Sequence, residues 1–138
     1  MTLSGDVFIY FQFPFEDGSH RDKWFVILNT SDISGKCISL KTTSHPERYQ
    51  GCTRGCNKTR RCFYAPNNWQ TCFTCDTFIQ LPQIFEFDTK EIIEGCLKKH
   101  MELKQPISSD CLHQLKACLA GFHDDISDRH WAMIYKGK

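Results

Sequence analysis

Apolar and polar residues alternate at the start of the chain. From Asp6 to Phe13 the odd positions would share one face of a β-strand, because successive side chains of a strand point to opposite sides. Pro14 ends this predicted strand, since proline has no N–H to donate to a neighbouring strand. The odd, same-face positions are Val7, Ile9, Phe11 and Phe13.

Shorter apolar stretches predict four further strands. A continuous apolar run covers residues 24–28, and strands are also expected over 37–41, 62–65 and 71–81. Between the third and fourth strands, residues 42–61 are rich in Gly, Thr, Cys and Arg and predict a long polar loop. In the last strand Cys75 shares a face with apolar residues, which predicts that it lies in the core: Phe73, Thr77, Ile79 and Leu81.

The period of the pattern changes at Asp88. Asp88 and Glu91 fit a helix-capping box, and one helical face follows, made by Ile92, Ile93, Cys96, Leu97, His100 and Met101. After Pro106, Ser108 or Ser109 is expected to cap a second helix that Gly121 ends, and Ser127 a last short one. Cys96, Cys111 and Cys118 lie on apolar helix faces and are interpreted as packing residues.

Strands followed by helices predict an α+β fold. We expect a small β-barrel over about residues 5–85 and helices over about 88–136. The length of 138 residues fits one domain spanning residues 1–138.

The apolar runs, the N-terminal residues and the cysteines indicate the cellular compartment in which we expect the protein. No run approaches the roughly 18 apolar residues of a membrane span, and the N-terminal residues lack the pattern of a signal peptide. We therefore expect a cytoplasmic protein without a membrane partner. In a reducing compartment the nine cysteines would be metal ligands or small buried apolar residues rather than disulfides.

Cysteines cluster in and after the polar loop. Their spacing suggests a structural zinc site, because four thiolates at close spacing suit tetrahedral zinc. Free thiols are an equally weighted interpretation. The candidate ligands are Cys52, Cys56, Cys62 and Cys72, with His45 as a substitute.

Positive charge is concentrated in the middle of the chain. Although the net charge is +1, residues 18–66 hold nine Lys or Arg against three acids. Cations and interleaved aromatic residues suit single-stranded nucleic acid, although such asymmetry is also typical of a solvated basic surface. The candidate RNA-binding residues are Arg48, Arg54, Lys58, Arg60 and Arg61, near Tyr49, Tyr64 and Trp69.

Cations and hydroxyls also occur at two strand ends. Arg21 and Lys23 precede the second strand, and residues 41–45 (Lys-Thr-Thr-Ser-His) follow the third. Together they could meet at a phosphodiester, whose transition-state charge cations stabilise. Spacing alone favours the simpler interpretation that Thr and Ser begin a loop.

The order of these segments resembles the PemK/MazF-like family. Gly5-Asp6-Val7 opens the first strand, and two further segments follow it, Phe13–Gly18 and Lys23–Asn29. Leu40–Ser44 looks like the family's Thr- or Ser-containing strand end, and Asp76–Leu81 resembles its late strand. The likeness covers roughly residues 5–85.

This resemblance implies an SH3-like barrel, a homodimer, and the toxin half of a toxin–antitoxin pair that cleaves single-stranded RNA without a catalytic cofactor. An Arg beginning the second strand and a Thr or Ser ending the third carry the family's chemistry. These positions fall on Lys23 and Thr42, with Arg21, Thr43 and His45 nearby. The family's Arg-Pro pair is replaced here by Lys23-Trp24, and its common pattern has no cysteine-rich insert.

Two other functions fit the same residues. A non-catalytic module could bind protein or nucleic acid through a zinc-pinned cysteine loop. A barrel of this kind could also inhibit a protein target such as gyrase, as relatives of the fold do.

Overall fold

The computed structural model describes residues 2–67, 69, 73 and 75–136. Its strands are β1 (Val7–Pro14), β2 (His20–Ile27), β3 (Lys36–Thr43), β4 (Gly55–Asn57), β5 (Cys62–Ala65), β6 (Thr77–Asp88) and β7 (Met101–Lys104). Its helices are α1 (Thr89–Leu97), α2 (Ser109–Ala120) and α3 (Asp128–Trp131), which a π-helical turn (Ala132–Lys136) extends. Short 3-10 turns cover Pro46–Arg48, Lys58–Arg60 and His123–Asp125.

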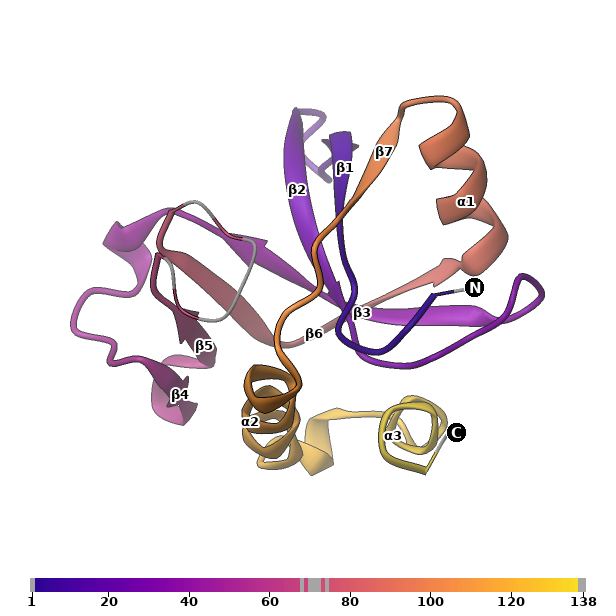
Figure 1. Cartoon of the computed structure of the whole chain (residues 1–138). Coiled ribbons are helices and arrows are strands. Elements are labelled where there is room, and N and C mark those ends of the chain that lie inside the picture. The colour runs from indigo at the N-terminus through magenta and orange to yellow at the C-terminus, as the bar shows by residue number, and fades with distance from the viewer. Residues whose placement is uncertain (1, 68, 70–72, 74, 137–138) are drawn as a thin grey trace.

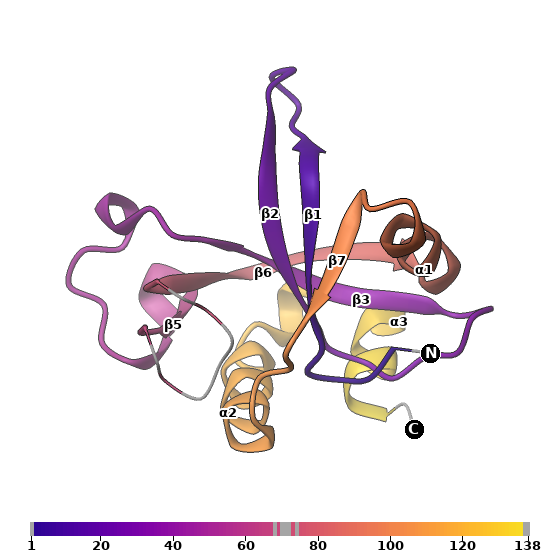
Figure 2. The same ribbon diagram turned by 45° about the horizontal axis from the view of Figure 1, so that its top comes forward.

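The strands form one antiparallel sheet in the order β4-β5-β6-β3-β2-β1-β7. The sheet bends strongly, and the β1–β2 hairpin rises away from β3 and β6 (Figures 1 and 2). It does not close, because β4 and β7 each have only one neighbour in that order. The α+β class is therefore confirmed, and an SH3-like barrel is not.

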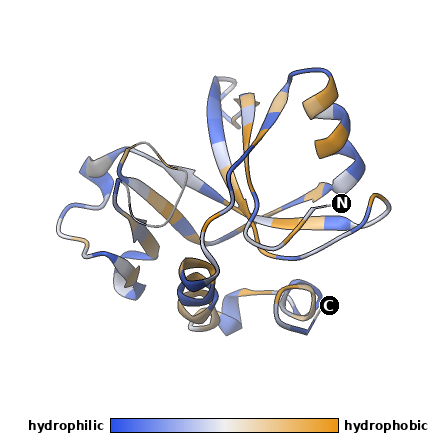
Figure 3. Cartoon of the chain, viewed as in Figure 1, coloured by the Kyte–Doolittle hydropathy of each residue, from blue (hydrophilic) through white to orange (hydrophobic). Residues whose placement is uncertain are grey.

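Apolar side chains are buried on both faces of the sheet. Val7 packs in a cluster with α2 and the segment after it, whereas the next residue, Phe8, packs in a second cluster with Ile92 of α1. This alternation follows from the two-residue period of a strand. Figure 1 accordingly shows α1 on one side of β3 and β6, and α2 and α3 on the other. Figure 3 shows the apolar stretches of the strands between these helices.

The predicted alternation of β1 is interrupted at Gln12. The pairing of β1 with β2 shifts between Tyr10 and Phe13, and Gln12 has a left-handed φ of 55°. An extra residue in a strand moves every later side chain to the other face. Phe13 therefore packs against Phe25 on the α1 side instead of sharing the face of Val7.

The last predicted strand is displaced. Within the described residues β6 begins at Thr77, not at residue 71, and it runs on to Asp88; residues 71, 72 and 74 lie outside the described residues. Cys75 consequently precedes the strand and is exposed. Its predicted place in the core is wrong, because the alternation was extended to residues that do not belong to the strand.

Helices do not occupy all of residues 88–136, because β7 interrupts them. Lys99, with a left-handed φ of 63°, follows α1, and Met101 then pairs with Tyr10 of β1. Gly95 allows Met101 to cross α1 closely, since a Cβ at Gly95 would lie 2.9 Å from the Met101 side chain. The helical period continued through this segment, and tertiary pairing with β1 overrode it.

Helix starts were predicted well. Ser108 caps α2 by accepting a hydrogen bond from the Cys111 N–H at 3.0 Å, and Ser127 caps α3. Asp88 occupies the N-cap of α1 as expected, but its side chain makes no capping hydrogen bond. Its carboxylate pairs instead with Lys36 on the neighbouring strand.

Cys118 is not only a packing residue. It forms a disulfide with Cys56, which ties the edge strand β4 to α2. Cys111 is buried and free, and Cys96 is half-buried, as a packing role requires. Among the described residues, no helix is both long and apolar enough to traverse a membrane.

The packing of α1 against one face of the sheet leads to a first prediction. Ile92 is fully buried under the sheet, whereas Leu97 at the end of the same helix is 79% exposed. Ile92→Ala should lower the free energy of unfolding by about 2–5 kcal/mol, the usual cost of truncating a buried aliphatic residue. Leu97→Ala should change it by less than about 0.5 kcal/mol. Urea denaturation of both variants checks this, and equal losses would contradict the packing of α1.

A second prediction concerns the attachment of α3 to β6. Hydrogen bonds from Arg129 and His130 lower the pKa of Glu86 to about 2 from its ordinary 4.5. A carboxylate with a lowered pKa stabilises the fold above its ordinary pKa, and this stabilisation is lost as pH falls toward the lowered value. Glu86→Gln should therefore be less stable than the wild type at neutral pH, and the difference should shrink between pH 4.5 and 2.

Urea midpoints measured across this pH range check the second prediction. Glu91→Gln is the matched control, because Glu91 is exposed and forms no ion pair within the described part of the chain. A constant difference between wild type and Glu86→Gln at every pH would contradict the role of the carboxylate.

Candidate anion-binding site

The start of β2 and the end of β3 lie next to each other. The two strands are antiparallel, and Phe25 pairs with Lys41. A pocket of about 170 Å³ opens there. It is lined by Asp22, Lys23, Trp24, Thr42, Thr43, Ser44, Phe73, Cys75 and Thr77. The structure thus brings Lys23 and Thr42 to one pocket, as the sequence predicted.

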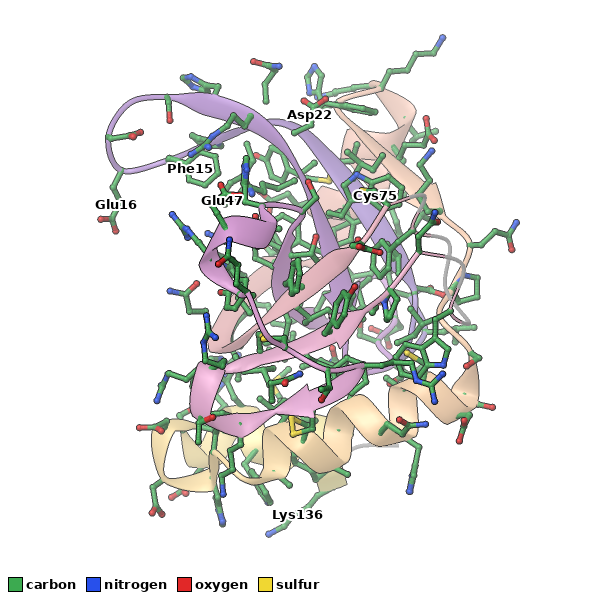
Figure 4. All side chains as sticks on the ribbon, turned by 90° about the vertical axis from the view of Figure 1, so that its left-hand side faces the viewer. Phe15, Glu16, Asp22, Glu47, Cys75 and Lys136 are labelled. Carbon is green, nitrogen blue, oxygen red and sulfur yellow. A yellow bond between two sulfur atoms is a disulfide. The ribbon has the colours of Figure 1, made fainter. Side chains whose placement is uncertain are left out.

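Phe15, in the turn after β1, is surrounded by cations. The Arg21 guanidinium carbon lies 4.6 Å from the centre of the Phe15 ring, and the amino groups of Lys41 and Lys23 lie 5.2 and 5.8 Å from it. An aromatic face attracts positive charge at such distances. Figure 4 looks onto this side, with Phe15 and Glu16 on the β1–β2 connection and Glu47 on a neighbouring turn. We call Arg21, Lys23, Lys41 and Arg48 the cation cluster.

Burial and mutual repulsion make the protonated, charged form of the lysines in the cluster less favourable. They lower the pKa of Lys23 to about 8, first by desolvation and then through Lys41, Arg21 and Arg48. The pKa of Lys41 is also lowered, by desolvation and by the charges of Arg48 and Arg21. A bound anion would offset this repulsion, because opposite charge favours the protonated form.

The acids near the cation cluster make their direct contacts with other groups, but Asp17 also interacts with Arg21: hydrogen bonds from Ser19 and, to a smaller extent, the charge of Arg21 lower the pKa of Asp17. Asp17 accepts hydrogen bonds from Ser19, Asp22 accepts one from the Gln12 N–H at 3.0 Å, and Glu47 lies 3.5 Å from His45. In the described part of the chain, no member of the cation cluster forms an ion pair. The cluster is therefore a positive site without a direct ion-pair partner among the described residues.

Two threonines end β3 at this pocket. Thr42 and Thr43 are 4% and 5% exposed, and the Thr43 hydroxyl accepts a hydrogen bond from the His45 N–H at 3.3 Å. The His45 ring lies on the exposed turn and pairs with Glu47. Thr42 and Thr43 line the pocket, whereas His45 does not.

The basic residues predicted to bind RNA do not form one surface. Arg48 belongs to the cation cluster through its charge on Lys23 and Lys41. Arg60 has a structural role, because its guanidinium donates hydrogen bonds to the backbone carbonyls of Gln50 and Arg48 at 2.6 and 2.7 Å. Arg60 therefore holds in place the loop that carries Arg48.

The other three basic residues face different parts of the molecule. Arg54 lies over the Trp69 ring at 5.0 Å. Arg61 lies over Phe122, beyond α2. Lys58 approaches the end of α2, where a Cβ at Gly121 would meet its side chain at 2.9 Å.

The predicted zinc ligands that the structure describes do not form one set of free thiols. Cys56 is bonded to Cys118 and so is not a free thiolate. Cys52 and Cys62 are free, with their sulfur atoms 3.5 Å apart, and Cys72 lies outside the described residues. Over residues 2–67, 69, 73 and 75–136, no three His, Cys, Asp or Glu side chains gather as a metal site would require.

Phe15 was missed as a site residue, whereas Lys41 belonged to the segment of residues 41–45 that was expected to meet Arg21 and Lys23 but was given no role of its own. Strand alternation places Lys41 on the same side as Thr43, two residues further on, so a signal for Lys41 was present. Nothing in the sequence around Phe15 indicated that three cations would gather at its ring. Comparisons of the chain with protein-family models, with curated proteins and with solved structures found no match.

Proposed function

We propose that the cation cluster binds the phosphate backbone of single-stranded RNA. The observation that carries this proposal is the gathering of four cations without an ion-pair partner among the described residues, beside a pocket that ends in two threonines. Cationic side chains neutralise phosphates and release their counterions. A pocket of about 170 Å³ suits a group of the size of a phosphate or a part of one nucleotide.

The bound RNA would be cleaved at this pocket. The ribose 2′-hydroxyl would give its proton to solvent as its oxygen attacks the adjacent phosphorus. The bond to the 5′-oxygen would break, and a 2′,3′-cyclic phosphate and a 5′-hydroxyl would result. Lys23 supports such a step, because an amino group with a pKa of about 8 is mostly protonated at neutral pH and can give a proton to the leaving oxygen. The Thr42 hydroxyl would donate a hydrogen bond to a non-bridging oxygen.

Arg21 and Thr43 would support these two residues in the proposed site. Arg21 does not line the pocket, and its charge beside Phe15 would attract the phosphate backbone next to the pocket. Thr43 would act by position, since its hydroxyl accepts the His45 N–H and so fixes the turn after β3. The role of proton donor moves from His45 to Lys23, because His45 does not line the pocket.

Other features of the resemblance belong to the same proposal. Membership of the PemK/MazF-like family would make the bent sheet a relative of the SH3-like barrel, with a homodimer and an antitoxin as partners. The cytoplasmic location also stays a prediction. Disulfides are rare in that compartment, and the Cys56–Cys118 disulfide therefore favours a more oxidising one.

A non-catalytic RNA-binding module is the second candidate. Tyr49, Phe78 and Tyr64 stack in succession, with ring centres 5.1 and 4.7 Å apart, and the Cys56–Cys118 disulfide fixes the neighbouring edge of the sheet without a metal. Aromatic side chains of this kind can stack with bases. Binding without cleavage of a panel of RNAs would favour this candidate.

The third prediction tests the pocket itself. Lys23→Ala and Thr42→Val should each lower the rate of RNA cleavage by about 10²-fold or more, the scale seen when one transition-state donor is removed. Thr42→Ser keeps the hydroxyl and should retain most of the activity. Lys98→Ala is the matched control, because Lys98 is an exposed lysine outside this pocket.

Fragment analysis of labelled RNA and circular dichroism of each variant separate activity from folding. Normal cleavage by folded Lys23→Ala and Thr42→Val would contradict the catalytic assignment. If the wild type binds RNA but cuts none, the module is the function. If Lys23→Ala and Lys98→Ala bind RNA equally well, the cation cluster is not the binding site.

A further inference from the structure

Two free cysteines face each other next to the loop that carries Arg48, a member of the cation cluster. Cys52 is half-exposed and precedes β4, and Cys62 is the buried first residue of β5. Their sulfur atoms are 3.5 Å apart, so a small movement would bring them to bonding distance, which is about 2 Å for a disulfide.

Core packing does not account for this pair. Neither Cys52 nor Cys62 belongs to the two apolar clusters that cover the faces of the sheet. Cys62 pairs across the sheet with Gln80, whose amide N–H₂ donates to the Tyr49 hydroxyl at 3.3 Å. The amide oxygen of Gln80 is buried with no hydrogen-bond partner among the described residues. Cys62 is therefore fully buried but lies beside polar groups of Gln80 and Tyr49 rather than inside either apolar cluster.

The two thiols differ in reactivity. Burial, together with the neighbouring Cys52, raises the pKa of Cys62 to about 12, and the charge of Arg60 opposes this shift. A thiolate is the reactive form of cysteine, and exposure decides which thiol meets a reagent. Cys52 should therefore react first, and Cys62 should attack second from its buried position.

We propose that Cys52 and Cys62 are a reversible dithiol–disulfide site that low-molecular-weight disulfides, such as oxidised glutathione, convert to the bonded form. The Cys52 thiolate attacks one sulfur of the reagent, the reagent's S–S bond breaks, and one thiol leaves. Cys62 then loses its proton and attacks the Cys52 sulfur, which expels the second thiol. Two protein thiols and one small disulfide thus become one protein disulfide and two small thiols.

This bond would fix the loop between the 3-10 turn at Pro46–Arg48 and β5. At present the loop is held by Arg60 through the carbonyls of Gln50 and Arg48 and by the stacking of Tyr49 on Phe78. A covalent link from Cys52 to β5 would restrict Arg48, which belongs to the cation cluster. This last consequence rests on the proposed function, whereas the dithiol chemistry does not.

Oxidation of the full chain by glutathione disulfide is the test. Peptide mapping should find Cys52 linked to Cys62, with no glutathione on either cysteine and with the Cys56–Cys118 disulfide retained. In Cys62→Ser, glutathione should remain attached to Cys52, because the second thiol is missing. Cys75→Ser is the matched control, since Cys75 is free and exposed, and it should form the same disulfide as the wild type.

Trypsin gives an independent readout that needs no RNA. Cleavage after Arg54 and Lys58, both exposed in this loop, should become severalfold slower on oxidation and recover on reduction. A stable glutathione adduct on wild-type Cys52, a link between other cysteines, or unchanged proteolysis of the linked protein would each overturn the proposal. None of these readouts depends on whether the protein binds or cleaves RNA.

Discussion

The pairing of β3 with both of its neighbours is the constraint on which the structure depends. β3 is the middle strand of the sheet, bonded to β2 on one side and to β6 on the other. Its side chains are buried on both faces, Ile38 toward α2 and Cys37 toward α1. A strand enclosed in this way has one register, because a slip of one residue would exchange its two faces. The positions of Thr42 and Thr43 at its end follow directly.

The candidate site lies where the helices no longer cover the faces of the sheet. The helices cover the apolar part of the sheet, and the hairpin of β1 and β2 extends beyond that cover (Figure 2). The register shift before Phe13 directs the Phe13 ring toward Phe85, and Lys41 lies over the Phe85 ring. Cations are thus held against aromatic rings in a partly desolvated place, where none of them has a direct ion-pair partner among the described residues and an anion would be favoured.

Local signals in the sequence predicted local structure. Alternation predicted β1, short apolar stretches predicted β3 and β5, and hydroxyl caps predicted the starts of α2 and α3. Long-range pairing could not be predicted in the same way: β7 exists because Met101 meets β1, and the Cys56–Cys118 disulfide joins residues that only the folded chain brings together. For the site, strand order brought Lys23 and Thr42 together as expected. The cations around Phe15 depend on the bend of the hairpin, which no residue pattern encodes by itself.

Lys23 lies in a cation cluster without direct ion-pair partners among the described residues, and we propose that an RNA phosphate completes it. The most direct measurement is the pKa of Lys23 by NMR of the full chain with ¹³C-labelled lysine, assigned with Lys23→Arg. A pKa of about 8 in the free protein is predicted, and a short RNA that cannot be cleaved, with 2′-deoxy substitution, should raise it. A pKa near the ordinary 10.5 that does not respond to RNA would contradict the account.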